Sequence, residues 1–184
     1  DEQGAGQAQR EPGAYALNFA LDAVAAHFAE RARACGADVS LAFALPERLP
    51  LPEADFCMAM ANLLENAVEA CERAVREEAG ADGRGSTAQD GARPLFVDAE
   101  ARIEGNAVLV SVRNSCTPSD ARALAAAAPD GVLSSDVRSA KREGDGIGLA
   151  SVATLAKRYR GEVQVEIDEY AATIHVLLFA GDAR

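Results

Sequence analysis

The chain has 184 residues, of which 49% are hydrophobic and 26% are charged, and its 18 Lys and Arg against 29 Asp and Glu give a formal net charge of −11. These values are typical of one soluble, acidic globular domain. No stretch reaches the roughly 18 apolar residues that a membrane span needs, and no signal peptide opens the chain. The excess of negative charge argues against sequence-independent binding to nucleic acid or to a membrane surface.

The four cysteines are widely spaced and form no CxxC pair, which argues against the usual zinc and thioredoxin-type sites. We expect these cysteines to be buried thiols in a reducing cytosol. The chain begins at Asp1 rather than at a methionine, which suggests a fragment of a longer protein.

The first half of the chain is predicted to contain a leader, a helix, a strand and a second helix. Residues 1–14 are polar, contain Gly and Pro and show no periodicity, so we expect a disordered leader or linker. Apolar residues at helical spacing predict helices over about 16–35 and 53–78. Between them, alternating apolar residues predict a strand over 39–45.

The second half begins with a connection over 79–94, which is rich in Gly, Ala and small polar residues and is predicted to be flexible. The remaining predicted elements are a hairpin of strands over 95–102 and 107–113, a short helix over 119–128, a helix that follows Gly144–Gly148 and ends near Arg160, and a last hairpin that pairs 162–168 with 172–179.

Hairpins of strands with helices between them predict an α+β fold, in which a mixed sheet is covered on one face by about three helices, as in a two-layer α/β sandwich. A doubly wound nucleotide-binding fold would instead need regular βαβ alternation. We expect one domain over residues 15–181.

Three glycines at alternate positions, Gly144, Gly146 and Gly148, stand directly before a predicted helix. Backbone N–H groups of such a turn can approach an anion closely, and the helix N-terminus adds free donors and partial positive charge. The segment could therefore hold a phosphate, although a glycine-rich turn before a helix is also common as simple loop geometry. It is neither a Rossmann fingerprint, because no strand precedes it, nor a Walker loop, because no GK[ST] ends it.

The second predicted helix carries Asn62 and Asn66 four residues apart on one face, and Glu69 and Arg73 continue that stripe. Asparagine is a poor helix former, so two of them within one helix suggest a use for their side-chain oxygens. A neutral amide oxygen suits Mg²⁺ that keeps most of its waters and also contacts phosphates. A pair of surface amides is the alternative.

Taken together, Asn62–Asn66 and Gly144–Leu149 resemble the N box and the second glycine box of the GHKL superfamily, specifically of the catalytic domain of sensor histidine kinases. The pair Asn114-Ser115, the triplet Ser139-Ala140-Lys141 and Glu69 resemble a peptide-pheromone-receptor-like subgroup of these kinases. The resemblance covers about residues 15–180 and implies a Bergerat-type ATP-binding fold. It implies ATP and Mg²⁺ as ligands, and transfer of the γ-phosphoryl group to a histidine on a dimerisation helix that this chain lacks. It further implies a response regulator downstream and a cytoplasmic domain of a membrane-bound parent, and the fragment alone is expected not to autophosphorylate.

The resemblance implies a role for each matching residue. Asn66 would coordinate Mg²⁺, while Asn62, beside the triphosphate, and Lys141, which brings positive charge to the terminal phosphates, would be the catalytic residues. Asn114 stands where the family's Asp-x-Gly-x-Gly motif has its aspartate, and its amide oxygen would accept a hydrogen bond from the adenine amino group. Thr173 on the last strand would also contact adenine.

The glycine box would bind the nucleotide phosphates through Gly144, Gly146 and Gly148. Ile147 and Leu149 complete the box, and their side chains are expected in the core rather than on the ligand. Residues 117–143 would form an ATP lid that nucleotide orders.

Three other functions remain open from the sequence. A gyrase-type ATP hydrolase would place a water-activating glutamate at the position of Asn62, and Glu65, which is adjacent to Asn66 in sequence, lies about 100° around the helix from Asn66 and points elsewhere. An anti-sigma-type serine kinase, or a degenerate regulatory module that has lost the adenine-box glycines, would share the fold. His27 and His175 are expected to be structural rather than phosphoacceptors.

Overall fold

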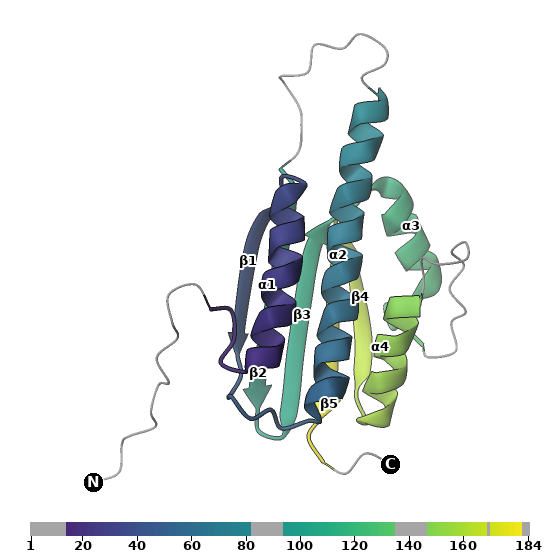
Figure 1. The fold of residues 1–184 in the computed structure, drawn as a ribbon. Helices are drawn as coiled ribbons and strands as arrows, with labels where there is room; N and C mark the ends of the chain where they lie inside the picture. Colours follow the sequence, from purple (N-terminus) through teal and green to yellow (C-terminus); the bar gives the residue numbers. More distant parts are fainter. Residues whose placement is uncertain (1–13, 82–93, 135–146, 169, 182–184) are drawn as a thin grey trace.

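The computed structural model describes residues 14–81, 94–134, 147–168 and 170–181, which form a five-stranded sheet and four helices (Figure 1). The predicted α+β class is confirmed, and the element boundaries fall close to those expected from the sequence. In chain order the elements are α1 (Phe19–Ala34), β1 (Asp38–Ala44), α2 (Glu53–Ala81), β2 (Phe96–Glu104), β3 (Ala107–Ser115), α3 (Pro118–Ala127), α4 (Ile147–Arg158), β4 (Glu162–Asp168) and β5 (Ala171–Phe179).

The sheet has the strand order β1-β2-β3-β5-β4 and is mixed, as predicted. β1 and β2 are parallel, with Asp38 opposite Phe96, and the other neighbouring pairs are antiparallel. Parallel strands cannot be joined by a tight turn, so α2 provides the crossover between β1 and β2. The last hairpin inserts β5 into the sheet beside β3 and leaves β4 at the edge.

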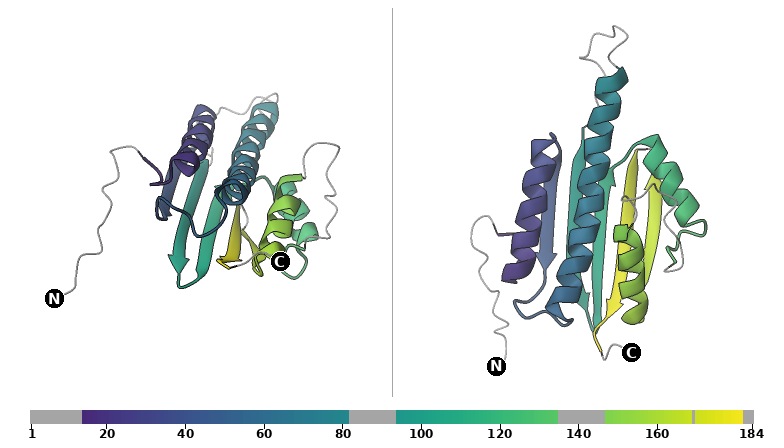
Figure 2. Two further views of the ribbon diagram at one scale, coloured as in Figure 1. Left: turned by 60° about the horizontal axis from the view of Figure 1, so that its bottom comes forward. Right: turned by 45° about the vertical axis from the view of Figure 1, so that its right-hand side comes forward.

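Three helices, α1, α2 and α4, lie on one face of the sheet, and α2 runs between the other two (Figures 1 and 2). α3 lies near β4 at the end of the sheet where β3 finishes. Within the described part of the chain no helix covers the opposite face, where exposed polar side chains such as Glu100, Arg102 and Glu162 alternate with the buried ones. This pattern is that of a two-layer α/β sandwich.

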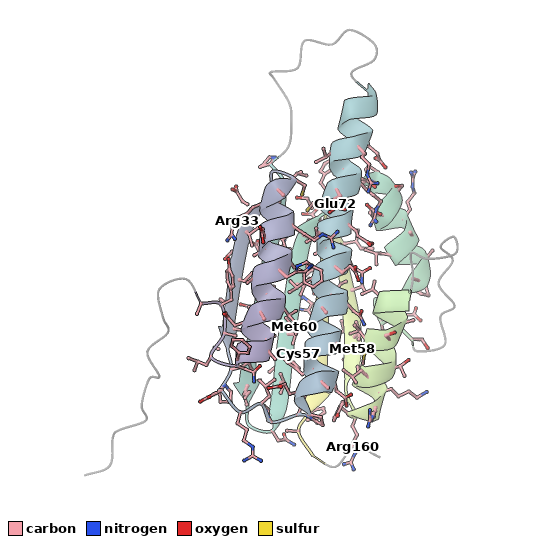
Figure 3. All side chains as sticks on the ribbon, in the orientation of Figure 1. Arg33, Cys57, Met58, Met60, Glu72 and Arg160 are labelled. Atoms are coloured by element: carbon pink, nitrogen blue, oxygen red, sulfur yellow. The ribbon has the colours of Figure 1, made fainter. Side chains whose placement is uncertain are left out.

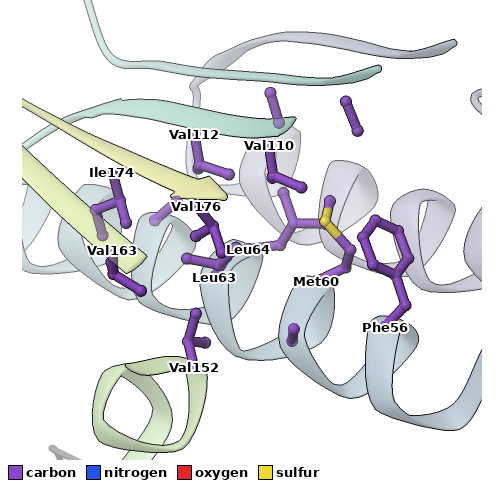
Figure 4. Packing of buried hydrophobic residues seen from close by; sticks show 14 of the residues in the cluster. Phe56, Met60, Leu63, Leu64, Val110, Val112, Val152, Val163, Ile174 and Val176 are labelled. Carbon is purple, nitrogen blue, oxygen red and sulfur yellow. The ribbon is translucent and has the colours of Figure 1, made fainter. Parts of the chain in front are cut away.

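The hydrophobic core fills the space between the sheet and the helices (Figure 4). Period-two alternation turns Val110 and Val112 of β3 toward the helical layer, where they meet the apolar stripe of α2. Met60, Leu63 and Leu64 of that stripe are almost fully buried. α2 is therefore the central helix of the core as well as the carrier of the paired asparagines.

Helix α1 begins at a residue that also ties it to α2. Asn18 is the N-cap, and its Oδ1 accepts a 2.9 Å hydrogen bond from the backbone N–H of Leu21. Its Nδ2 donates to the carboxylate of Glu53 at 2.7 Å, in the first turn of α2. The two helices are thus fixed relative to each other near the start of the domain.

The predicted lid, residues 117–143, is structured in its first part. α3 forms most of it, and residues 131–133 pair with the outer edge of β4 through Leu133 N–H to the Val163 carbonyl and Val165 N–H to the Gly131 carbonyl. The remainder of the lid from residue 135 lies outside the described residues, as do the leader 1–13 and residues 82–93 of the predicted connection.

Candidate functional site

The paired asparagines of α2 are linked to each other within the helix. Nδ2 of Asn66 donates a 2.6 Å hydrogen bond to the backbone carbonyl of Asn62. This bond fixes the orientation of the Asn66 amide and leaves its Oδ1 as the free acceptor, since no residue in the described ranges donates to it. Both asparagines are half-buried, so the oxygen stands at an accessible edge of the helix.

The N-terminal turn of α4 contacts these same asparagines. A Cβ atom added at Gly148 would lie 2.9 Å from Nδ2 of Asn66 and 3.6 Å from Cβ of Asn62. Real Cβ atoms essentially never approach another atom this closely, so an alanine here would force the end of the Asn66 side chain to move. The fold therefore brings together the asparagine pair and the glycine-box helix, which are about 80 residues apart in the sequence.

The remaining residues predicted for the glycine box are only partly described. α4 begins at Ile147, and Leu149 packs against the hydrophobic core, as expected for a residue that completes the box. Lys141, Gly144 and Gly146 lie outside the described residues, so their predicted roles stay predictions.

Asn114 lies near the end of β3, buried between β2 and β5, where it is paired with Val97 and Ala172. Its Nδ2 donates a 2.9 Å hydrogen bond to the carbonyl of Ser115, so the amide is oriented with Oδ1 as its free acceptor. No hydrogen bond among the described residues involves Oδ1 of Asn114. An oxygen placed in this way can accept a hydrogen bond from an amino group of a ligand.

Thr173, the other residue predicted to contact adenine, is not brought to the same place. It is paired with Arg113 on the face of the sheet that no described helix covers, whereas Asn114 and Ala172 face the helices. Alternation with the buried Ile174 would have indicated this orientation from the sequence. Ala172 is the β5 residue beside Asn114, and as an alanine in an apolar strand it gives no signal of a binding role in the sequence.

A small apolar cluster lies next to Asn114 and is separate from the main core. Ala70 of α2, Cys116 and Ala172 of β5 are buried in it, and Ala121 and Leu124 of α3 pack against them. Burial, and secondarily the nearby Asp120, raises the pKa of the Cys116 thiol to about 11, so the side chain stays neutral and acts as an apolar wall. The three buried side chains are small, and α3 packs over them.

The acidic residues of α2 near the asparagines are turned toward other partners. Glu65 faces α1, where its carboxylate lies 4.0 Å from the guanidinium of Arg31. Glu69 lies 3.7 Å from the guanidinium of Arg73. Glu65 therefore points away from α4 and from the site, as the helical geometry predicted.

A metal held mainly by protein side chains does not fit the described residues. They contain no group of three or more His, Cys, Asp or Glu side chains that could hold a metal ion. The chemistry at Asn66 is instead that of one neutral amide oxygen, which suits Mg²⁺ because that ion keeps several waters and binds substrate phosphates directly.

Solved structures of histidine kinase catalytic domains resemble this chain over most of its length. The catalytic domain of the histidine kinase ThkA aligns with 89% of this chain and 92% of its own, at 16% identity and a TM-score of 0.55. A histidine kinase from Burkholderia phymatum STM815 aligns with 89% of this chain and 68% of its own, at 17% identity and a TM-score of 0.55. The chain has the fold of histidine kinase catalytic domains.

Full-length ShkA in complex with AMPPNP aligns with 98% of this chain at 22% identity and a TM-score of 0.54, and the aligned part is 34% of the ShkA chain. No family model matches the sequence, and no curated protein does. The resemblance to histidine kinase catalytic domains that the sequence motifs indicated is thus confirmed in the fold, whereas the peptide-pheromone-receptor-like subgroup remains a prediction. No helix in the described ranges is both long and apolar enough to cross a membrane.

Proposed function

We propose that this chain is the ATP-binding catalytic domain of a two-component sensor histidine kinase, which transfers the γ-phosphoryl group of ATP to a histidine on a dimerisation helix outside this chain. The observation that carries the proposal is the contact of Gly148 with Asn66, in a fold shared with histidine kinase catalytic domains. This contact brings two features together: a helix N-terminus, which can bind phosphate, and an amide oxygen, which can bind Mg²⁺.

In this proposal the chain's own residues position the triphosphate. The N-terminus of α4 and the backbone of Gly144–Gly148 donate hydrogen bonds to phosphate oxygens, and Lys141 brings positive charge to the terminal phosphates. Asn62 lies beside the triphosphate, and Oδ1 of Asn66 holds Mg²⁺, which when bound neutralises part of the phosphate charge. These features matter in a chain of net charge −11, because its overall field repels an anionic ligand.

The base would bind at the other end of the site, at Asn114 and the cluster of Ala70, Cys116 and Ala172. This assignment is supported by the free acceptor oxygen of Asn114 and by the small apolar side chains next to it. Thr173 is left out of the proposed site because it lies on the opposite face of the sheet.

The phosphoacceptor is proposed to lie on another part of the parent kinase. His27 is exposed on α1 and packs edge-on against the ring of Phe28, and His175 lies 3.8 Å from the carboxylate of Glu166 on the uncovered sheet face. Neither lies on α2 or α4. The natural partners would be a dimerisation helix with an acceptor histidine and a downstream response regulator, and the domain would act in the cytoplasm.

The first test measures the stability of this chain with and without Mg²⁺ and ATP. A ligand that binds only the folded state adds about 2.7 kcal/mol at about 100 times its Kd. We expect stabilisation by ATP with Mg²⁺ in the unmodified chain, loss of its Mg²⁺-dependent part in Asn66→Ala, and no loss in Asn106→Ala, whose exposed side chain lies in the β2–β3 turn. The absence of any shift at millimolar nucleotide would exclude ATP binding.

The second test separates phosphotransfer from hydrolysis in the parent protein. A histidine kinase would retain the γ-phosphate as an acid-labile, alkali-stable phosphohistidine. A gyrase-type hydrolase would release it as inorganic phosphate and would lose that activity in Glu65→Gln, whereas the position of Glu65 beside Arg31 favours no such role.

A further inference from the structure

We propose that Arg73 is a positioning residue of the nucleotide site, which acts through Asp120 to fix the end of β3 that carries Asn114 and so sets the affinity for ATP. The inference rests on the proposed function, because it gives Arg73 a part in the base-binding end of that site. Arg73 belongs to the same helical stripe as Asn62 and Asn66, but it points to α3 rather than to α4.

The contact between α2 and α3 is an ion pair with direct hydrogen-bond geometry. Nε of Arg73 donates to Oδ1 of Asp120 at 2.9 Å. The other carboxylate oxygen, Oδ2, accepts from the backbone N–H of Thr117 at 3.2 Å and from its hydroxyl at 3.0 Å. Because the backbone N–H of Asp120 also donates to the Thr117 hydroxyl, Thr117 and Asp120 form a complete capping box at the start of α3.

Asp120 is buried, with 7% of its surface exposed, so its carboxylate depends on these partners. A buried charge is costly unless it is paired and hydrogen-bonded. In the described part of the chain, Arg73 is the only basic side chain that pairs with Asp120. Glu69, 3.7 Å from the guanidinium, is the second acidic neighbour of Arg73 and is more exposed than Asp120.

The capping box is joined to Asn114 by a short, fully packed segment. Thr117 follows Asn114 by three residues, and between them the backbone N–H of Cys116 donates to the carbonyl of Tyr170 at 2.9 Å. The side chain of Cys116 is buried against Ala70, with α3 packed on the same cluster. A shift of α3 would therefore be transmitted to the strand end rather than absorbed by a flexible loop.

Arg73 also stands on the helix that carries the proposed Mg²⁺ ligand. Asn66 and Arg73 are separated by about two helical turns, or about 10 Å along α2. The Arg73–Asp120 pair thus fixes the spacing between the Mg²⁺ end of the site and the base end. Loss of the pair should disturb the alignment of the two ends without removing any group that contacts the ligand.

The test compares Arg73→Gln with a matched control, Arg31→Gln. Arg31 forms an ion pair of the same 2.9 Å length with Glu72, which is labelled on α2 in Figure 3, but this pair joins α2 to α1 and lies away from α3. We expect the Kd for ATP with Mg²⁺ to rise about tenfold in Arg73→Gln and to stay within about twofold of the unmodified chain in Arg31→Gln.

A second readout reports the position of Asn114 directly. The NMR signals of the Asn114 side-chain amide should shift in Arg73→Gln without nucleotide present and remain in place in Arg31→Gln. If Arg73→Gln does not fold, Arg73→Lys keeps the charge but not the Nε geometry and should show both effects in weaker form. A folded Arg73 variant with unchanged ATP affinity and unchanged Asn114 signals would overturn the proposal. Failure of the unmodified chain to bind ATP would count against the proposed function instead, and the Asn114 signals would still test the positioning.

Discussion

The hydroxyl of Tyr159 donates a 2.6 Å hydrogen bond to Oδ2 of Asp55, which joins the C-terminal end of α4 to the first turn of α2. Arg158 adds a 3.2 Å contact to the same carboxylate. At the other end of α4, Gly148 lies against Asn66. The two helices are therefore held together, antiparallel, at both ends of α4, and the helix N-terminus proposed to bind phosphate is fixed in position relative to the proposed Mg²⁺ ligand.

Gly148→Ala should abolish most of the affinity for ATP with Mg²⁺ while changing the free energy of unfolding by less than about 1 kcal/mol. The new Cβ would lie 2.9 Å from Nδ2 of Asn66, so the amide must turn away from the Asn62 carbonyl and its Oδ1 must move with it. The cost in stability is small because a side-chain end can shift, and alanine is the better helix former. Calorimetry and denaturant titration measure the two quantities.

A matched glycine control separates this contact from a general effect of the added methyl group. A Cβ atom added at Gly181 would meet no heavy atom within 4 Å, and the backbone there is not left-handed, so Gly181→Ala should leave stability and ATP affinity unchanged. Unaltered affinity in Gly148→Ala would show that the close approach of α4 to Asn66 has no part in nucleotide binding.

Tyr159→Phe should lower the free energy of unfolding by about 1.5 kcal/mol, because it removes a hydrogen bond from a buried phenol to a carboxylate. Tyr15→Phe removes an exposed contact with Arg33 and should cost less than about 0.5 kcal/mol. Burial, with a smaller contribution from Asp55, raises the pKa of Tyr159 from 10.0 to about 12. The folded state thus holds the phenol proton more tightly than the unfolded chain does. The protonated Tyr159 therefore contributes its full share to the free energy of unfolding below about pH 10, and this share is lost as the pH rises through about 12. Equal stability losses in the two variants would contradict this account.

The unmodified chain should bind ATP at least about tenfold more tightly than GTP, and Asn114→Ala should reduce that preference. Oδ1 of Asn114 can accept a hydrogen bond from the amino group of adenine, whereas guanine has a carbonyl at that position, which could only pair with the amide if the amide turned and gave up its present bond to the Ser115 carbonyl. A missing or mismatched hydrogen bond of this kind costs about 1–3 kcal/mol. Competition binding with the two nucleotides measures the ratio. If Asn114→Ala kept the full preference for ATP over GTP, a residue other than Asn114 would select the base.

Cys71 and Cys116 should resist thiol reagents in the folded protein at about pH 8, while the half-buried Cys35 and Cys57 react first. Burial is the main reason that the pKa of Cys71 is raised from 9.0 to about 12 and that of Cys116 to about 11. Little reactive thiolate therefore forms at either position until the chain unfolds. Mass spectrometry of the labelled protein gives the order of reaction.

The same shifts predict a loss of stability in alkali. The folded state holds these thiol protons more tightly than the unfolded chain does, so both thiols contribute fully to the free energy of unfolding below about pH 9. The contribution of Cys116 is lost as the pH rises toward 11, and that of Cys71 as the pH rises toward 12. The free energy of unfolding should fall over that interval, and less steeply in Cys71→Ala. Rapid labelling of Cys71 in the folded state would show that it is not shielded.

The helices and strands, and the side of each that is buried, follow from the pattern of residues along the chain. Alternating residues such as Val110 and Val112 and the apolar stripe of α2 encode local periods that hold in almost any packing, so the helices, strands and hairpins were predicted close to their observed bounds. The same alternation applied to Ile174 would have turned Thr173 away from the site. The family motifs pointed to Asn66 and Gly148 as candidate site residues, and their roles stay predictions.

Which of these residues come into contact depends on the packing of the whole fold. The placement of β5 between β3 and β4, the approach of Gly148 to Asn66, and the pairing of Arg73 with Asp120 all join residues that are far apart in the chain. Local periodicity carries no information about such pairs, because they depend on how whole layers pack and on which buried charge needs a partner.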